Sequence, residues 1–284
     1  MDRSEAPRAL SFAEFETLIA GIELISTLGR RISETIGGKP CHYLIQEATM
    51  AFVKMLMSVQ AFLRSIPSSR FHAREVEFAI DLSSASVKAR QVMEDAIVFF
   101  YLSETSLTEV EKVFRSLVWQ LHSATETLES LDYIVPEKTD AQLVAAQKQG
   151  REFLGKPPYD AMMESIEPGR RGRIRKGREN HVLHEDEILS RRGIRLDTYD
   201  FWRKLLSNFA HFSGLSHRLT MQTTSDWRKS WQAFYAAAFC VANFGAEAVE
   251  ACIETFPETR LLLTKQEQAA IANLRSWIRS DSQT

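Results

Sequence analysis

SFAEFETLIAGIELISTLGRRISETIGGKP, residues 11–40, is the stretch that decides the fold. Ser11 and Glu14 have the spacing of a capping box, in which the hydroxyl accepts a backbone N–H and the carboxylate bonds back to the N-cap. Apolar residues then recur every three or four positions: Phe15, Leu18, Ile22, Ile25, Ile32 and Ile36. Gly37 and Pro40 end the pattern. The stretch therefore predicts one long amphipathic helix.

The same helical signals recur along the rest of the chain, and two-residue alternation is almost absent. Two further capping boxes, Ser106–Glu109 and Thr264–Glu267, predict helix starts. Helices are expected over residues 42–64, 71–102, 140–154 and 225–256, after Ser106, and after Thr264. This pattern predicts an all-α protein, an extended multi-helix bundle with long antiparallel helices.

One segment breaks the helical composition. Residues 167–184 contain Pro168, three glycines and the dense basic run GRRGRIRKGREN. Such a composition is unusual for a core helix and predicts a basic mobile loop. The loop would join an N-terminal helical layer, residues 1–166, to a C-terminal layer, residues 185–284, with the two layers packing as one structural domain.

Bulk properties set limits on the function. The chain has 284 residues, 44% hydrophobic and 25% charged, as an ordinary folded protein has. Its formal net charge is −2, so any site for a polyanion must be a local patch. Cys41, Cys240 and Cys252 are widely spaced and are expected to be small core residues. No uncharged apolar window reaches the length of a membrane span, and a polar start predicts a cytoplasmic protein with no membrane partner.

The basic run is the first candidate site. Its residues are Arg170, Arg171, Arg173, Arg175, Lys176 and Arg178. Guanidinium groups bind phosphate through paired hydrogen bonds, so this run could follow an RNA or DNA backbone. No aromatic residue is interleaved to stack on bases, and a solvated loop is the simpler interpretation.

Arg90 and Glu94 form a second candidate site, one helical turn apart on a face shared with Val87, Ile97 and Tyr101. A charged pair on an otherwise apolar stripe predicts burial, where each charge needs a partner. The pair would either fix the packing of its helix or face a site as an electrostatic clamp.

A third set of polar residues lies in residues 199–211. Its members are Tyr199, Ser207, Asn208 and His211. The last three would share a polar face of one helix with Lys204, while Phe209 would take the core side. A histidine with hydroxyl and amide neighbours can act as a general acid or base. A histidine that only hydrogen-bonds a neighbour is the alternative.

The motifs of several enzyme classes are missing from the sequence. There is no GxSxG, Walker A, GxGxxG or kinase signature. His181 and His184 lie in HVLHEDE, which has ligands suited to a divalent metal but lacks the HExxH spacing. We therefore predict no metal and no cofactor.

RQVME at residues 90–94, followed by AIVFFYL at 96–102, resembles a family of all-helical bacterial proteins without an assigned function, which is distantly related to the HEPN (higher eukaryotes and prokaryotes nucleotide-binding) group. That family pairs Arg-x-x-x-Glu with a later Tyr and Ser-x-x-x-His, here Tyr199 and Ser207–His211. HEPN ribonucleases carry Arg-x(4–6)-His, whereas seven residues separate Arg203 from His211. Three pairs match the HEPN spacing literally: Arg115–His122, Arg175–His181 and Arg178–His184. About this many matches are expected by chance.

The resemblance implies a helical effector that acts on or binds RNA in a bacterial defence, toxin or stress system. If it is an enzyme, the resemblance implies a metal-independent ribonuclease, often a homodimer. His211 would then promote attack of a ribose hydroxyl, and Arg90, held by Glu94, would stabilise the charge that develops on phosphorus. The alternatives are a helical interaction scaffold or regulator with a protein partner, and a small-molecule sensor with a pocket between helices.

Overall fold

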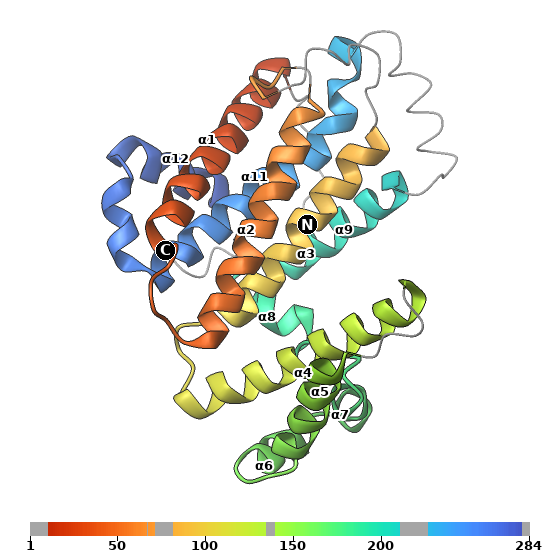
Figure 1. The fold of residues 1–284 in the computed structure, drawn as a ribbon. Coiled ribbons are helices and arrows are strands. Elements are labelled where there is room, and N and C mark those ends of the chain that lie inside the picture. Colours follow the sequence, from red (N-terminus) through yellow and green to blue (C-terminus); the bar gives the residue numbers. More distant parts are fainter. Residues whose placement is uncertain (1–10, 67, 72–81, 135–139, 211–226, 280–284) are drawn as a thin grey trace. The chain divides into compact units, whose positions relative to one another are not determined.

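The computed structural model describes residues 11–66, 68–71, 82–134, 140–210 and 227–279. Within these ranges every regular element is a helix (Figure 1), and the only β-type pairing is an isolated bridge between Ile194 and Arg279. The prediction of an all-α, multi-helix protein is confirmed.

The chain divides into two compact units, which we describe separately. Unit 1 comprises residues 1–40, 48–100 and 189–284, and unit 2 comprises residues 41–47 and 101–188. These boundaries differ from the expected layers: most of unit 2 comes from the second half of the expected N-terminal layer together with the basic segment.

Unit 1 is built on long helices (Figure 1). Its elements are α1 (Phe12–Ile36), most of α2 (Tyr43–Arg64) and α3 (Leu82–Leu102), α9 (Leu196–Ala210), α11 (Trp227–Thr255), the 3-10 helix η1 (Pro257–Leu262) and α12 (Lys265–Ser276). The predicted stripe of α1 is largely buried, and α1 packs against α11 and α12. Helix α11 supplies an almost fully buried run of Ala, Val and Phe side chains.

Capping explains where these helices start, with one correction. Both predicted boxes at Ser11–Glu14 and Thr264–Glu267 are present. The box predicted at Ser106–Glu109 is wrong. Instead, Thr108 Oγ1 accepts from the N–H of Glu111 at 3.3 Å, and Glu111 accepts from the N–H of Thr108 at 2.8 Å. Helix α4 (Glu109–Ile134) therefore starts later than that box predicts, and Val110 in its first turn is exposed.

Unit 2 contains α4, α5 (Ala141–Leu154), α6 (Tyr159–Glu164), α7 (Pro168–Arg175) and the first residues of α8 (Glu185–Arg191). Helices α4 and α5 pack together. Its apolar cluster has fully or nearly fully buried members from four of these helices: Phe114, Val118, Leu121, Leu154, Met163 and Ile174.

The basic segment is not a loop between layers, and that prediction is wrong for residues 168–175, which form α7. The side chain of Glu167 caps the helix by accepting from the N–H groups of Gly169 and Arg170, and Pro168 takes the first turn, where no N–H is needed. Gly177, at φ 71°, ends it: its own N–H bonds Ile174 O, and the next N–H, of Arg178, bonds Arg173 O. The Pro and Gly that suggested a loop are the boundaries of a helix.

Helix α11 bears on the membrane prediction. Residues Phe234–Thr255 are long and apolar enough to cross a membrane, and nearly all of that window is buried inside the protein. Cys240 and Cys252 lie on this helix and are buried, as expected of core residues, whereas Cys41 is partly exposed.

Candidate functional site

Arg90 and Glu94 on α3 form an ion pair, with Arg90 Nε 2.7 Å from Glu94 Oε1. The expectation that the pair is buried is wrong, because the two side chains are 34% and 52% exposed. The stripe that carries them is itself half open: Val87 is exposed, whereas Ile97 is buried. The guanidinium group is therefore oriented by a carboxylate and remains accessible to solvent.

Helix α9 brings one predicted partner to Arg90. Arg90 Nη1 donates to Ser207 Oγ at 3.4 Å. Tyr199 on the same helix is buried, its ring centroid 6.0 Å from that of Phe244, which is a core position. His211 lies outside the described residues. The structure thus joins Arg90, Glu94 and Ser207, whereas Tyr199 is buried beside Phe244.

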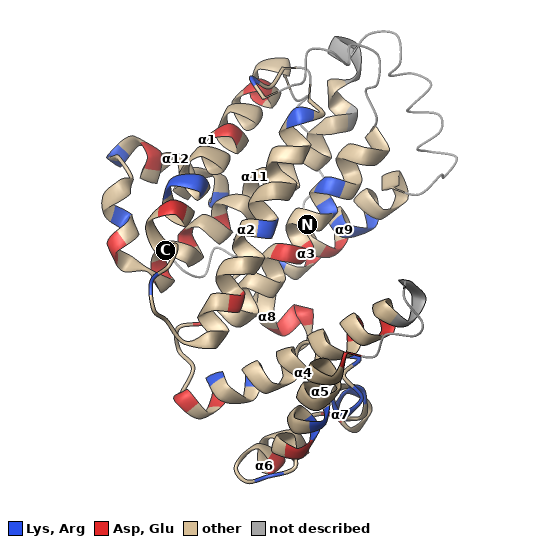
Figure 2. Cartoon of the chain, in the orientation of Figure 1, with Lys and Arg blue, Asp and Glu red and all other residues tan. Residues whose placement is uncertain are grey.

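Most of the predicted nucleic-acid-binding arginines are paired within unit 2. Arg173 Nε lies 2.9 Å from Glu179, Arg175 Nη2 lies 3.4 Å from Glu164, and Arg171 also bonds Glu164. Arg170 is buried, with Glu179 Oε1 3.8 Å from its Nη2. The basic residues of α7, coloured blue on the ribbon in Figure 2, are therefore largely neutralised by neighbouring carboxylates.

Lys176 and Arg178 differ from the other members of the basic run. They line an open groove of about 550 Å³ in unit 2, together with Arg151 on α5. Thr125, Leu128, Glu129, Val144 and Gln147 complete its walls. None of the three basic side chains has a carboxylate partner among the described residues. The groove thus presents three unpaired positive charges against one negative charge, which suits an anionic ligand.

Arg115 and His122, the literal HEPN-type match on α4, are both engaged. Arg115 is buried, and it donates to Tyr101 O at 2.5 Å and to Glu104 at 2.7 Å. His122 Nδ1 lies 2.9 Å from the carbonyl oxygen of Gly177. These contacts hold the end of α3 and the end of α7, so the pair has a structural role.

The two histidines considered as metal ligands have other surroundings. Arg170 Nη2 donates to His184 Nδ1 at 3.0 Å, and His181 is buried with its ring centroid 4.7 Å from that of Tyr101. Burial and the nearby positive charge of Arg170 lower the pKa of His181 to about 3. Over the part of the chain that the structure describes, no group of three or more His, Cys, Asp or Glu side chains could hold a metal ion.

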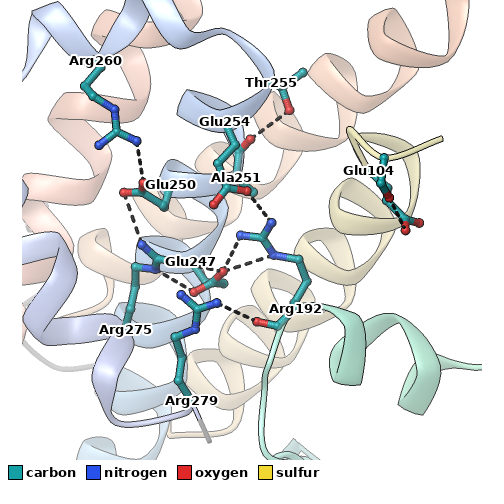
Figure 3. Close-up of polar contacts among 11 residues, drawn as sticks. Glu104, Arg192, Glu247, Glu250, Ala251, Glu254, Thr255, Arg260, Arg275 and Arg279 are labelled. Atoms are coloured by element: carbon teal, nitrogen blue, oxygen red, sulfur yellow. Dashed lines mark hydrogen bonds and ion pairs between the residues drawn. The ribbon is translucent and has the colours of Figure 1, made fainter. Parts of the chain in front are cut away.

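A polar cluster in unit 1 was not foreseen from the sequence (Figure 3). The carboxylate of Glu247 on α11 is fully buried, and it accepts from Arg192 Nη2 at 2.5 Å and from Arg275 Nε at 2.8 Å. Burial alone would raise the pKa of Glu247, but the guanidinium groups of Arg192 and Arg275 outweigh it and lower that pKa. Arg192 also pairs with Glu254, and Arg275 with Glu250. The cluster joins α11, α12 and the residues after α8, so it stabilises unit 1.

The buried carboxylate of Glu247 could have been predicted from the sequence, whereas the groove position of Arg151 could not. Glu247 is the lone charged residue between Phe234 and Ala248, which marks it as a buried charge in need of partners. Arg151 has no comparable signal, because only the packing of α5 beside α4 brings it to Lys176 and Arg178.

Comparison with known proteins finds no match to this chain among family models, curated proteins or solved structures.

Proposed function

We propose that this protein binds RNA through the groove of unit 2, as a helical effector in a bacterial defence, toxin or stress system. The observation that carries the proposal is the set of three basic side chains, Arg151, Lys176 and Arg178, that line the groove without carboxylate partners among the described residues. The negatively charged oxygens of phosphate would take the place of the missing carboxylate partners. Arginine binds such oxygens with charge-assisted hydrogen bonds.

The lining of the groove favours contact with the RNA backbone rather than with bases. It contains no aromatic side chain, among the residues described, on which a base could stack. Gln147 and Thr125 are already bonded to each other at 2.9 Å, so they add little base-reading capacity. We therefore expect affinity for single-stranded RNA with little sequence preference.

Binding is tested by fluorescence anisotropy with a labelled single-stranded RNA. Arg151→Gln/Arg178→Gln removes two groove charges, and Lys148→Gln/Lys156→Gln removes two exposed charges of unit 2 that do not line the groove. We expect the groove variant to bind at least tenfold more weakly and the control variant to bind as the wild type does. Equal loss in both variants would show a general charge effect and would contradict the proposal.

The ribonuclease part of the proposal rests on Arg90. Glu94 fixes its Nε, its Nη1 reaches Ser207, and the side chain stays partly exposed, as a group that contacts a phosphate must. His211 would supply the proton transfer. Expression of wild type, Arg90→Ala and His211→Ala in a bacterial host, with growth and total RNA followed, tests this step. Growth arrest with RNA cleavage only in the wild type, at equal soluble yield, is the expected result.

An interaction module is the second candidate, and two exposed methionines on α2 favour it. Met50 and Met57 are two turns apart and are both about two-thirds exposed. Flexible methionine side chains are common on surfaces that bind protein partners. A second copy of the chain would be the simplest partner. Sedimentation of wild type and Met50→Glu/Met57→Glu distinguishes a dimer that depends on these methionines from a monomer.

A further inference from the structure

Unit 2 contains a group of buried hydrogen-bond donors that its own residues leave unused. Arg170 is 7% exposed, and its Nε and Nη1 have no hydrogen-bond partner among the described residues. His181 is 8% exposed, and its Nε2, a donor in the neutral tautomer that carries the ring proton there, is also unpartnered within the same ranges. Leaving buried polar atoms unpaired is costly, and the cost is greatest for a charged group such as this guanidinium.

The unused donors lie close to one another. The rings of Tyr101 and His181 are in edge contact at 4.7 Å, and Tyr101 Oη accepts from the N–H of Val182 at 3.2 Å, which leaves the phenol proton free to be donated. The charge of Arg170 acts on both of these rings. Tyr101 on α3, Arg170 on α7 and His181 in the segment that follows α7 therefore belong to one buried neighbourhood of unit 2.

Arg170 has a weaker ion pair than the other guanidinium groups around it. Arg115 lies over the Tyr101 ring at 4.5 Å and is paired with Glu104. Arg170 has only Glu179 among the described carboxylates, at 3.8 Å, and Arg173 holds that same carboxylate at 2.9 Å. Glu167, which caps α7, adds a third carboxylate near Arg173, but its hydrogen bonds within the described ranges go to backbone N–H groups and none goes to the Arg170 guanidinium. His184, which bonds Arg170 Nη2 through Nδ1 at 3.0 Å, adds no negative charge, because a histidine ring is either neutral or positive.

We propose that Arg170, His181 and Tyr101 form a buried binding site for one compact inorganic anion, such as chloride or phosphate. An anion only accepts hydrogen bonds, as unused donors require, and it would give the Arg170 guanidinium a closer negative charge than Glu179 at 3.8 Å. This site is distinct from the RNA groove, whose basic residues are exposed. Its effect is to stabilise unit 2 in proportion to the anion concentration, because a ligand that binds only the folded state raises its stability.

The test is thermal unfolding of the full chain at constant ionic strength. Sodium gluconate, whose anion is too large for the site, is replaced stepwise by sodium chloride in one series and by sodium phosphate in another. We expect the Tm of the wild type to rise and then saturate in at least one series, which also identifies the preferred anion. Identical Tm values in all mixtures would overturn the proposal.

Variants assign the effect to the site. Arg170→Gln should abolish the saturable rise in Tm, whereas Arg178→Gln, an equal charge change in the groove, should retain it. If Arg170→Gln fails to fold, Tyr101→Phe removes a single O–H and should shift the midpoint of the anion titration to higher concentration. A rise in Arg170→Gln or Tyr101→Phe equal to that of the wild type would overturn the site. Arg178→Gln should weaken RNA binding alone, so the two proposals can fail separately.

Discussion

His181 is a buried residue whose protonation should be visible in the stability of the protein. Its pKa is lowered to about 3 by burial and by Arg170, whereas in the unfolded chain it titrates near its ordinary value of 6.5. Between these values the unfolded chain binds a proton that the folded chain does not. Stability is therefore full above about pH 6.5 and falls as the pH drops, by about 1.4 kcal/mol for each pH unit.

Urea unfolding at pH 7.5, 6.0 and 5.0 measures this dependence. We expect His181→Gln, which carries no titrating group at this position, to lose less stability than the wild type between pH 7.5 and pH 5.0. If the two proteins lose the same amount over that range, the folded state accommodates a protonated His181 and the effect of its burial has been overstated.

Glu247 gives a second prediction at the residue scale. Glu247→Gln replaces the buried carboxylate with a neutral amide and leaves Arg192 and Arg275 without their shared partner. Breaking a buried ion pair in this way costs about 3–5 kcal/mol. Glu254→Gln removes a partly exposed carboxylate that also bonds Arg192, and should cost no more than about 1 kcal/mol. Urea unfolding of both variants checks the contrast, and equal losses would contradict it.

At the scale of the element, two glycines of the basic segment should respond in opposite directions. A Cβ at Gly172 within α7 would meet no atom within 4 Å, so Gly172→Ala should stabilise the helix by about 0.5–1 kcal/mol. A Cβ at Gly177 would lie 2.1 Å from Thr125 Oγ1 and 3.0 Å from Leu121 O, at a φ of 71°. Gly177→Ala should destabilise the protein by at least about 1 kcal/mol.

Thermal unfolding measures the change in stability of both variants, which have the same charge as the wild type and nearly the same size. A stabilised Gly177→Ala variant would show that the turn after α7 does not need the left-handed conformation, and a destabilised Gly172→Ala variant would contradict the helical assignment of the segment.

These glycines also show why some elements could be predicted and α7 could not. Capping and apolar spacing are local, so the residues from Ser11 to Gly37 suffice by themselves to place α1. In residues 167–184 the composition of Pro and Gly predicted a loop, although their positions are those of a helix start and a helix end. The misplaced box at Ser106 has a similar cause, because Thr108 and Glu111 offered a competing box two residues later.

At the scale of the whole molecule, the sequence could indicate which residue types carry function but not which of them are free to do so. Six basic residues between Arg170 and Arg178 looked equivalent, yet Glu164 and Glu179 neutralise most of them and leave Lys176 and Arg178 in the groove. Arg90 and Ser207 are 117 residues apart, and only tertiary packing brings them within 3.4 Å. The division into two units likewise depends on contacts between distant parts of the chain.

The salt dependence of RNA binding is the prediction that belongs to this scale. Because the net charge of the chain is −2, attraction of RNA must come from the local charges of the groove. Contacts from Arg151, Lys176 and Arg178 to three phosphates of a single strand predict a slope of log K against log [salt] of about −2. Anisotropy titrations at several salt concentrations measure it.

Removal of one of these contacts should change that slope by a defined amount. Arg178→Gln should make the slope less negative by about 0.7, whereas Lys148→Gln, outside the groove, should leave it unchanged. A slope near zero would mean that binding does not use phosphate contacts. A steep slope that is the same in both variants would place those contacts elsewhere, and the groove would then lose its assigned role.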